Sequence, residues 1–188
     1  MTNTRKMVTI AILSALSFVL MFFSFPIIPA ASFLQIDFSV IPMMMALVMF
    51  DLKSSFAVLM LRSVLKLFLD NNGPSTYIGL PMNIVALGLF LAAFAIIWNR
   101  RKTIATYIYA SIVGSIALTL GMLVLNYFFA IPLYAKFANF DIGAFIGVKT
   151  YLVSMVIPFN MIEGIILAGA FYLIYVACKP VIERYQYS

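Results

Sequence analysis

Residues 151–178 read YLVSMVIPFNMIEGIILAGAFYLIYVAC, and Glu163 is the only side chain among them that is charged at neutral pH. As a helix, this segment is long enough to cross the ~30 Å hydrocarbon core of a bilayer. A carboxylate at that depth costs ~2.5–3.5 kcal/mol on insertion scales, so it marks a candidate functional site. The stretch therefore indicates a spanning helix that presents Asn160 and Glu163, three residues apart, on one face.

The rest of the chain has the same apolar character. Its 188 residues are 65% hydrophobic and 10% charged, whereas soluble domains average about 45–50% and about 25%. Hydropathic segments follow one another at residues 7–25, 38–50, 54–69, 76–98, 103–128 and 151–178. We therefore expect an all-α, polytopic membrane protein with six transmembrane helices, in which residues 1–188 form a single transmembrane domain.

The N-terminus has a basic start and an apolar core, as a signal peptide does. However, the apolar run from Met7 to Phe25 has spanning length, and further segments of the same kind follow it. We interpret it as a retained first helix.

Basic residues set the expected orientation, because cytoplasmic loops carry an excess of Lys and Arg. With both termini in the cytoplasm, eight of the twelve basic residues lie on that side. These are Arg5, Lys6, Lys53, Arg100, Arg101, Lys102, Lys179 and Arg184. The opposite orientation would place the NRRK cluster outside, so we expect both termini to be cytoplasmic.

Several functional classes are disfavoured by what the sequence lacks. It has no histidine, which removes the commonest general base and transition-metal ligand, and Cys178 is its only cysteine. It also has no GxxxxGK[ST] phosphate-binding loop. The net charge of +6 is explained by basic residues that flank spanning helices. We expect no catalytic residue, no metal site, no cofactor and no nucleic-acid partner.

Polar side chains gather in the outer halves of the expected spans. They are Asp37, Lys66, Asn83, Asn126, Asn160 and Glu163. The inner halves contain runs such as VALGLFLAAFAII and IILAGAFYLIYVA, without a charged residue. A channel or a self-contained transporter normally has polar groups that reach both faces, or internal repeats, and we find neither. Since a buried amide without a partner costs ~1–3 kcal/mol, the pattern predicts a pocket that is open to the outside and closed below.

Structural roles compete with this interpretation for three of the residues. Lys66 can extend to the outer interface instead of contacting a ligand. Asn83 can form a hydrogen bond between helices. Glu163 can pair with Lys66 as a structural ion pair.

For Asp37, capping of a helix that starts at Phe38 is as plausible as lining the pocket, and one side chain can do both. For Asn126 and Asn160 the pocket interpretation is the stronger. Both residues border the proline-containing outer loops.

The first segment contains AILSALS, in which Ala11, Ser14 and Ala15 fall at helical spacing. Small residues let another helix approach closely, and such packing drives helix association in lipid. From spacing alone, packing inside this bundle is slightly favoured over contact with a partner helix.

Five motifs occur together in this chain: AILSA, FLQIDFSVIP, DNNGPSTYIGLPMN, LNYFFAIPLY and PFNMIEG. With them the whole chain resembles the S-components of energy-coupling factor (ECF) vitamin transporters, and the last three motifs are specific to the riboflavin-binding group. The resemblance covers all six segments. It implies a six-helix protein of a prokaryotic cell membrane that captures riboflavin outside and delivers it with a transmembrane coupling subunit and two ATP-binding cassette ATPases.

The resemblance also implies roles for particular residues. Asn126 and Asn160 would hold the flavin, and the small face of Ala11, Ser14 and Ala15 would pack on the coupling subunit through its Ala11–Ala15 pair. One departure is that Glu163 stands where the family pattern PFNxxKG has a lysine, and Val40 breaks the DFSDIP pattern. Because a lysine only donates hydrogen bonds and an ionised glutamate only accepts them, either ligand donors meet Glu163 or the affinity is altered.

Two other classes of function compete with this interpretation. A self-contained, ion-coupled secondary transporter would use Glu163 as its proton site. An intramembrane enzyme would use Asp37 and Glu163 as acid and base, but no histidine, second close carboxylate or metal motif supports it.

Overall fold

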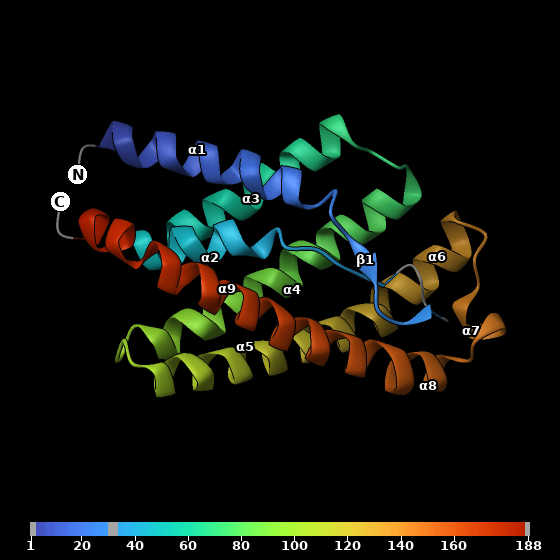
Figure 1. The fold of residues 1–188 in the computed structure, drawn as a ribbon. Coiled ribbons are helices and arrows are strands. Elements are labelled where there is room, and N and C mark those ends of the chain that lie inside the picture. Colours follow the sequence, from blue (N-terminus) through green and yellow to red (C-terminus); the bar gives the residue numbers. More distant parts are fainter. Residues whose placement is uncertain (1–2, 30–33, 187–188) are drawn as a thin grey trace.

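The computed structural model describes residues 3–29 and 34–186, and the chain is almost entirely helical (Figure 1). Its main helices are α1 (Asn3–Leu20), α2 (Val40–Met49), α3 (Leu52–Leu69), α4 (Pro74–Trp98), α5 (Ile104–Leu125) and α9 (Ile157–Gln186). These helices coincide with the hydropathic segments, which confirms the prediction of an all-α fold.

The connection between α5 and α9 is also helical. It comprises η2 (Asn126–Ala130), α6 (Ile131–Phe137), α7 (Ile142–Phe145), α8 (Val148–Tyr151) and η3 (Leu152–Val156). The elements η2 and η3 are π-helical turns, which are rare and frequent at functional sites. The hydropathic segments predicted no helix between residues 128 and 151, so the helical character of this connection is new.

Four helical stretches have the length and composition to cross a membrane on their own. They are Asn3–Leu20, Pro74–Trp98, Ile104–Phe137 and Val148–Pro180. The helix α2 is a shorter apolar helix, and α3 carries Lys53, Arg62 and Lys66 along its length. The predicted total of six crossings therefore depends on these two helices.

The helices form a bundle whose two ends differ (Figure 1). The helix α4 packs on α5, α5 packs on α9, and α1 packs on α2 and α3. Both chain ends lie at one end of the bundle, whereas α6, α7 and a small β-hairpin lie at the other (Figure 1). Chain ends on the same side are what an even number of crossings produces.

The hairpin was not predicted from the sequence. Strands β1 (Phe25–Pro26) and β2 (Gln35–Ile36) are antiparallel, with Phe25 opposite Ile36. Ile36 is fully buried and Leu34 is buried beside it. The first loop is thereby folded back over the end of the bundle that lies away from the termini.

Aromatic side chains fill the half of the bundle that lies near the termini. Along α4, Phe90 stacks on Phe94 and Phe94 contacts Trp98. Phe94 and Trp98 both contact Tyr107 of α5, which stacks on Phe171 of α9. All five side chains are buried. The Tyr107 hydroxyl donates to the Ala168 carbonyl at 2.6 Å, so the polar end of this ring is also satisfied. This half of the bundle is a packed core.

Helices α5 and α9 approach each other closely at Gly164. A Cβ added there would lie 2.1 Å from Ser115 Oγ and 3.2 Å from Ser115 Cα. We expect Gly164→Ala to lower the free energy of unfolding by roughly 1–3 kcal/mol, the usual cost of overpacking. The measurement is the thermal unfolding midpoint in detergent. Gly169→Ala on the same helix is the matched control, because its Cβ would meet no atom within 4 Å, and an equal loss in both variants would contradict this packing.

Candidate functional site

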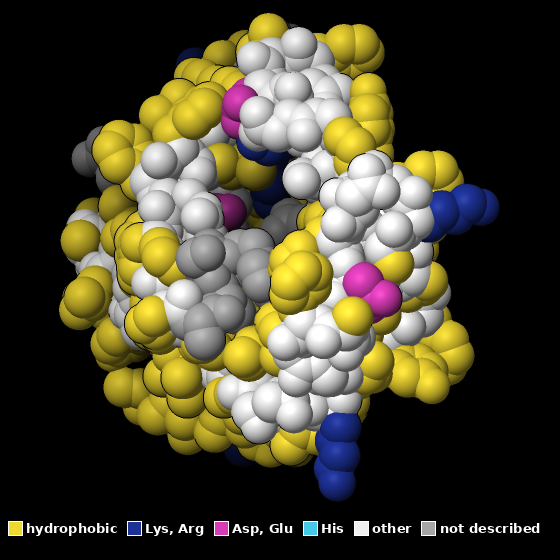
Figure 2. All heavy atoms as spheres, turned by 90° about the vertical axis from the view of Figure 1, so that its right-hand side faces the viewer, with side chains coloured by type: hydrophobic (Ala, Val, Ile, Leu, Met, Phe, Trp, Pro, Cys, Tyr) yellow, Lys and Arg dark blue, Asp and Glu magenta, His cyan; other side chains and the backbone are white. Residues whose placement is uncertain are grey.

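A cavity of about 160 Å³ lies between β2, α4, α5 and α9. It is at the end of the bundle away from the termini, and Figure 2 shows this end to be hollowed. Its wall is formed mainly by apolar and aromatic side chains, among them Leu34, Met82, Leu87, Met122, Tyr134, Tyr151 and Phe159. An apolar cavity with a few placed polar groups is typical of a site for a small organic molecule.

The structure brings four of the six predicted site residues to this cavity. They are Asn83 of α4, Asn126 of η2, and Asn160 and Glu163 of α9. Asp37 and Lys66 are not part of its wall. Gln35 and Leu34, which sequence analysis did not propose, reach the cavity because the hairpin folds the first loop back.

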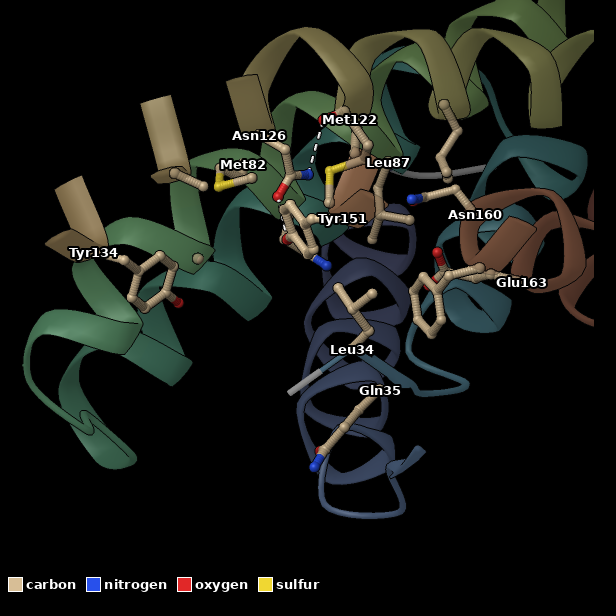
Figure 3. A pocket seen from close by; sticks show the side chains of 16 residues that line it. Leu34, Gln35, Met82, Leu87, Met122, Asn126, Tyr134, Tyr151, Asn160 and Glu163 are labelled. Atoms are coloured by element: carbon tan, nitrogen blue, oxygen red, sulfur yellow. Dashed lines mark hydrogen bonds between the residues drawn. The ribbon is translucent and has the colours of Figure 1, made fainter. Parts of the chain in front are cut away.

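Asn126 is held by two hydrogen bonds in the wall of the cavity. Its Nδ2 donates to the Met122 carbonyl at 2.8 Å, and its Oδ1 accepts from the Tyr151 hydroxyl at 2.6 Å. Both side chains are 2% exposed. Figure 3 shows the two facing each other, so this contact ties the π-helical turn η2 to α8. Tyr151 is a site residue that the sequence pattern did not single out.

Asn160 and Glu163 share one face of α9, as their spacing predicts, and both lie on the cavity (Figure 3). Asn160 Nδ2 donates to the Val156 carbonyl at 2.7 Å. Asn160 Oδ1 is buried and accepts no hydrogen bond from the part of the chain that the structure describes. The Glu163 side chain takes part in none of the side-chain hydrogen bonds or ion pairs of that same part. The α9 wall therefore presents the oxygen of an amide and a carboxyl group to the cavity.

Lys66 does not pair with Glu163, so that suggestion is wrong. Its ammonium group pairs instead with Asp70, four residues further along the chain at the end of α3. The local pair needs no ordering of distant segments, whereas a pair with Glu163 would have to bridge α3 and α9.

Asp37 has a local structural role that differs from the one predicted. The helix α2 begins at Val40 and not at Phe38, and Asp37 Oδ1 accepts a hydrogen bond from the Ser39 backbone N–H at 2.7 Å. The side chain therefore stabilises the turn before α2.

Arg62 of α3 is a buried charged residue that the sequence analysis did not propose for the site. The residue is 0% exposed. Its Nη2 donates to Asn83 Oδ1 at 2.7 Å, and its Nη1 contacts Met21 Sδ at 3.1 Å. The contact with Asn83 joins α3 to α4, so Asn83 forms a hydrogen bond between helices and also lines the cavity. The sequence signal that could have identified Arg62 is a cation in the middle of an apolar segment, because charged residues inside spanning helices mark functional sites.

The three small residues of α1 do not share one face. Ala11 and Ala15 are exposed. Ser14 is 2% exposed, and its hydroxyl donates to the Ile10 carbonyl at 2.7 Å. Ser14 therefore faces the inside of the bundle together with Ser17, so its assignment to the partner-binding face is wrong.

Comparison with known proteins places this architecture in a family. The model of a family described as "ECF transporter, substrate-specific component" matches residues 5–175. The chain is 57% identical over 184 residues to the protein named riboflavin transporter RibU of Streptococcus thermophilus, which covers 98% of this chain and 87% of that protein. It is 30% identical over 182 residues to riboflavin transporter FmnP of Bacillus subtilis, which covers 97% of this chain and 96% of that protein.

A solved structure, described as the S component of a bacterial ECF transporter, has the same fold. The TM-score is 0.81 at 29% sequence identity, and the match covers 96% of this chain and 99% of that chain. The relatives are transport proteins and not enzymes. The resemblance found in the sequence is thereby confirmed, and this chain belongs to the family of ECF transporter substrate-specific components, the S-components.

Proposed function

We propose that this chain captures riboflavin in the cavity between α4, α5 and α9 and serves as the riboflavin-binding subunit of a bacterial ECF importer. The observation that carries the proposal is the buried Asn160 Oδ1, which accepts no hydrogen bond from the described residues and lies with Glu163 on a cavity whose wall is mainly apolar and aromatic. Riboflavin has a flat, largely apolar ring system with an imide N–H at one edge. The names of the relatives from Streptococcus thermophilus and Bacillus subtilis support the choice of ligand.

Ring burial and a few hydrogen bonds supply the affinity in this proposal. The isoalloxazine ring lies among Met82, Leu87, Met122 and Phe159. Removing its apolar surface from water stabilises the complex by roughly 25 cal/mol per Å². The imide N–H donates to an acceptor on α9. Because a buried acceptor without a donor costs ~1–3 kcal/mol, this contact removes a penalty that the empty site carries.

The proposed topology has six crossings with both termini in the cytoplasm of a prokaryotic cell. It is supported by the basic residues Arg5 and Lys6 in the first turn of α1 and by the basic cluster at residues 100–102 in the connection from α4 to α5. Both of these segments lie at the end of the bundle that holds the termini (Figure 1). The cavity is then on the outer side of the cell membrane. Residues 1–188 act as one transmembrane substrate-binding domain.

Transport is proposed to require partners, namely a transmembrane coupling subunit and two ATP-binding cassette ATPases. Beneath the cavity, the buried rings of Phe90, Phe94, Trp98, Tyr107 and Phe171 fill the inner half of the bundle. Within residues 3–29 and 34–186, this packing favours a binding subunit over a transporter that uses Glu163 as its own proton site.

Titration of the purified protein with riboflavin, followed by flavin fluorescence, tests the binding. We expect saturable quenching of the flavin fluorescence, which an excess of thiamine or biotin does not reverse.

Proteoliposomes that contain this chain alone should bind riboflavin without accumulating it. Accumulation driven by a pH gradient would favour the self-contained transporter, and absence of quenching would refute riboflavin as the ligand.

A further inference from the structure

A second cavity, of about 250 Å³, adjoins the first and is walled by α3, the turn before α4 and α4 itself. Figure 2 looks onto this end of the molecule, and Lys or Arg side chains are visible deep in its hollow. The polar residues of its wall are Arg62, Lys66, Asn72, Ser75, Thr76 and Asn83. The two cavities therefore differ in character, since the first is mainly apolar and aromatic.

The two cavities meet at Gly79 and Asn83, one helical turn apart on α4, which line both. A Cβ added at Gly79 would meet no atom within 4 Å, so the wall is open at this point. Asn83 Oδ1 is occupied by Arg62 Nη2, and this fixes the amide so that its NH2 group remains as a donor.

Arg62 is a buried cation that the protein satisfies only in part. Its Nε has no hydrogen-bond partner among the described residues. The ion pairs of that same part of the chain, Lys6 with Asp51 and Lys66 with Asp70, do not include it. Since a buried donor left unpaired costs ~1–3 kcal/mol, an acceptor that enters this cavity recovers that cost.

The charges around the second cavity favour a neutral, acceptor-rich group over an anion. Lys66 is neutralised by Asp70, and the Asp37 carboxylate interacts electrostatically with Arg62. The wall offers guanidinium, ammonium and amide donors together with hydroxyl and amide oxygens as acceptors. A chain of hydroxyl groups matches this mixture, because each hydroxyl both donates and accepts.

We propose that the two cavities form one site with two parts, an inference that rests on the proposed riboflavin-binding function. The flavin ring occupies the cavity between α4, α5 and α9, and the ribityl chain passes Gly79 and Asn83 and accepts hydrogen bonds from Arg62. Arg62 is then the residue that selects a flavin with a polyhydroxylated tail over the bare ring.

Two ligands and one substitution test this arrangement. Lumiflavin has the same ring as riboflavin, with a methyl group in place of the ribityl chain. In Arg62→Met, riboflavin affinity is expected to fall roughly tenfold or more, as for loss of a hydrogen bond from a charged donor, and lumiflavin affinity by less than about twofold. Fluorescence titration of both ligands against the parent and the variant measures this difference, and the lumiflavin titration also reports whether the variant is folded.

Two further variants sharpen the experiment. Leu80 lines the second cavity but not the first, so Leu80→Trp should obstruct the tail and weaken riboflavin binding more than lumiflavin binding. Ser63 is a buried neighbour on α3 whose hydroxyl donates to the Leu59 carbonyl. Ser63→Ala is therefore the matched control and should leave both affinities unchanged.

The outcomes separate this inference from the function on which it rests. Selective loss of riboflavin affinity in Arg62→Met or Leu80→Trp supports the two-part site. If Arg62→Met binds neither flavin, the result for Leu80→Trp is used instead. The two-part site is then overturned if Leu80→Trp loses affinity for riboflavin and lumiflavin to the same extent. Unchanged riboflavin affinity in both variants overturns it as well. A parent protein that binds neither flavin overturns the proposed function itself.

Discussion

Asn160→Leu is expected to weaken riboflavin binding by roughly 1–3 kcal/mol, because a ligand donor buried against Asn160 Oδ1 would lose its acceptor. Leucine has the same branching and the same number of side-chain heavy atoms as asparagine, so no cavity is left behind. The amide makes one hydrogen bond, from Nδ2 to the Val156 carbonyl one turn earlier on the same helical stretch. Its loss should leave the packing of α9 intact. Equilibrium titration with riboflavin measures the effect.

Tyr151→Phe is the matched comparison, because it breaks a hydrogen bond in the same wall that belongs to the protein alone. The Tyr151 hydroxyl donates to Asn126 Oδ1, and its removal leaves that oxygen buried without a donor. We expect a lower thermal unfolding midpoint for Tyr151→Phe and an almost unchanged one for Asn160→Leu. Should Asn160→Leu lose stability to the same extent, or keep full affinity, Asn160 Oδ1 is not the ligand contact.

Hydropathy was sufficient to predict the main helices and the depth of the polar groups. Long apolar runs in a bilayer can satisfy their backbone only as helices, and position along a helix sets depth. For this reason Asn83, Asn126, Asn160 and Glu163 were expected at one level of the bundle, and the structure places all four on one cavity.

Direction around a helix was harder to predict than depth. Each π-helical turn inserts a residue into the helical pattern and turns the following side chains by ~100°, one residue's rotation in a helix of 3.6 residues per turn. The turns η2 and η3 flank the segment that carries Tyr151, which explains why this residue was missed. Ser14 shows the same limitation, because spacing identified a cluster of small residues but not the side on which the bundle packs.

Partners of charged residues were predicted least well. Lys66 had two carboxylates to choose from, and only three-dimensional proximity separates Asp70 from Glu163. The hairpin was missed for a similar reason. Strands of two residues are defined by their pairing across the loop, and they have too few residues for an alternating pattern.

Ala11→Glu and Ala15→Glu are expected to abolish riboflavin uptake by cells. The purified variants should still bind riboflavin with an affinity within about twofold of the parent, because substitutions at distant sites have independent effects. Both alanines are exposed on α1, and in the α1 span only 11% of the residues are buried. Among the described residues of α1, none lines the cavity proposed for the flavin ring. A glutamate on this face would hold a partner helix away and set an unpaired carboxylate into the contact. Uptake of labelled riboflavin, with equal expression verified, is the measurement.

Leu16→Glu separates a blocked partner contact from a general defect of membrane insertion. Leu16 is 47% exposed on the same helix but points away from the small face, at about 100° from Ala15 around the helix axis. It carries the same insertion cost for a charge. If Leu16→Glu abolishes uptake as fully as the alanine variants do, the charge acts through insertion and the small face has no special role. If riboflavin binding is lost together with uptake in Ala11→Glu or Ala15→Glu, the face supports the bundle itself. Selective loss of uptake in the alanine variants alone identifies the exposed small face as the surface through which this chain meets its coupling subunit.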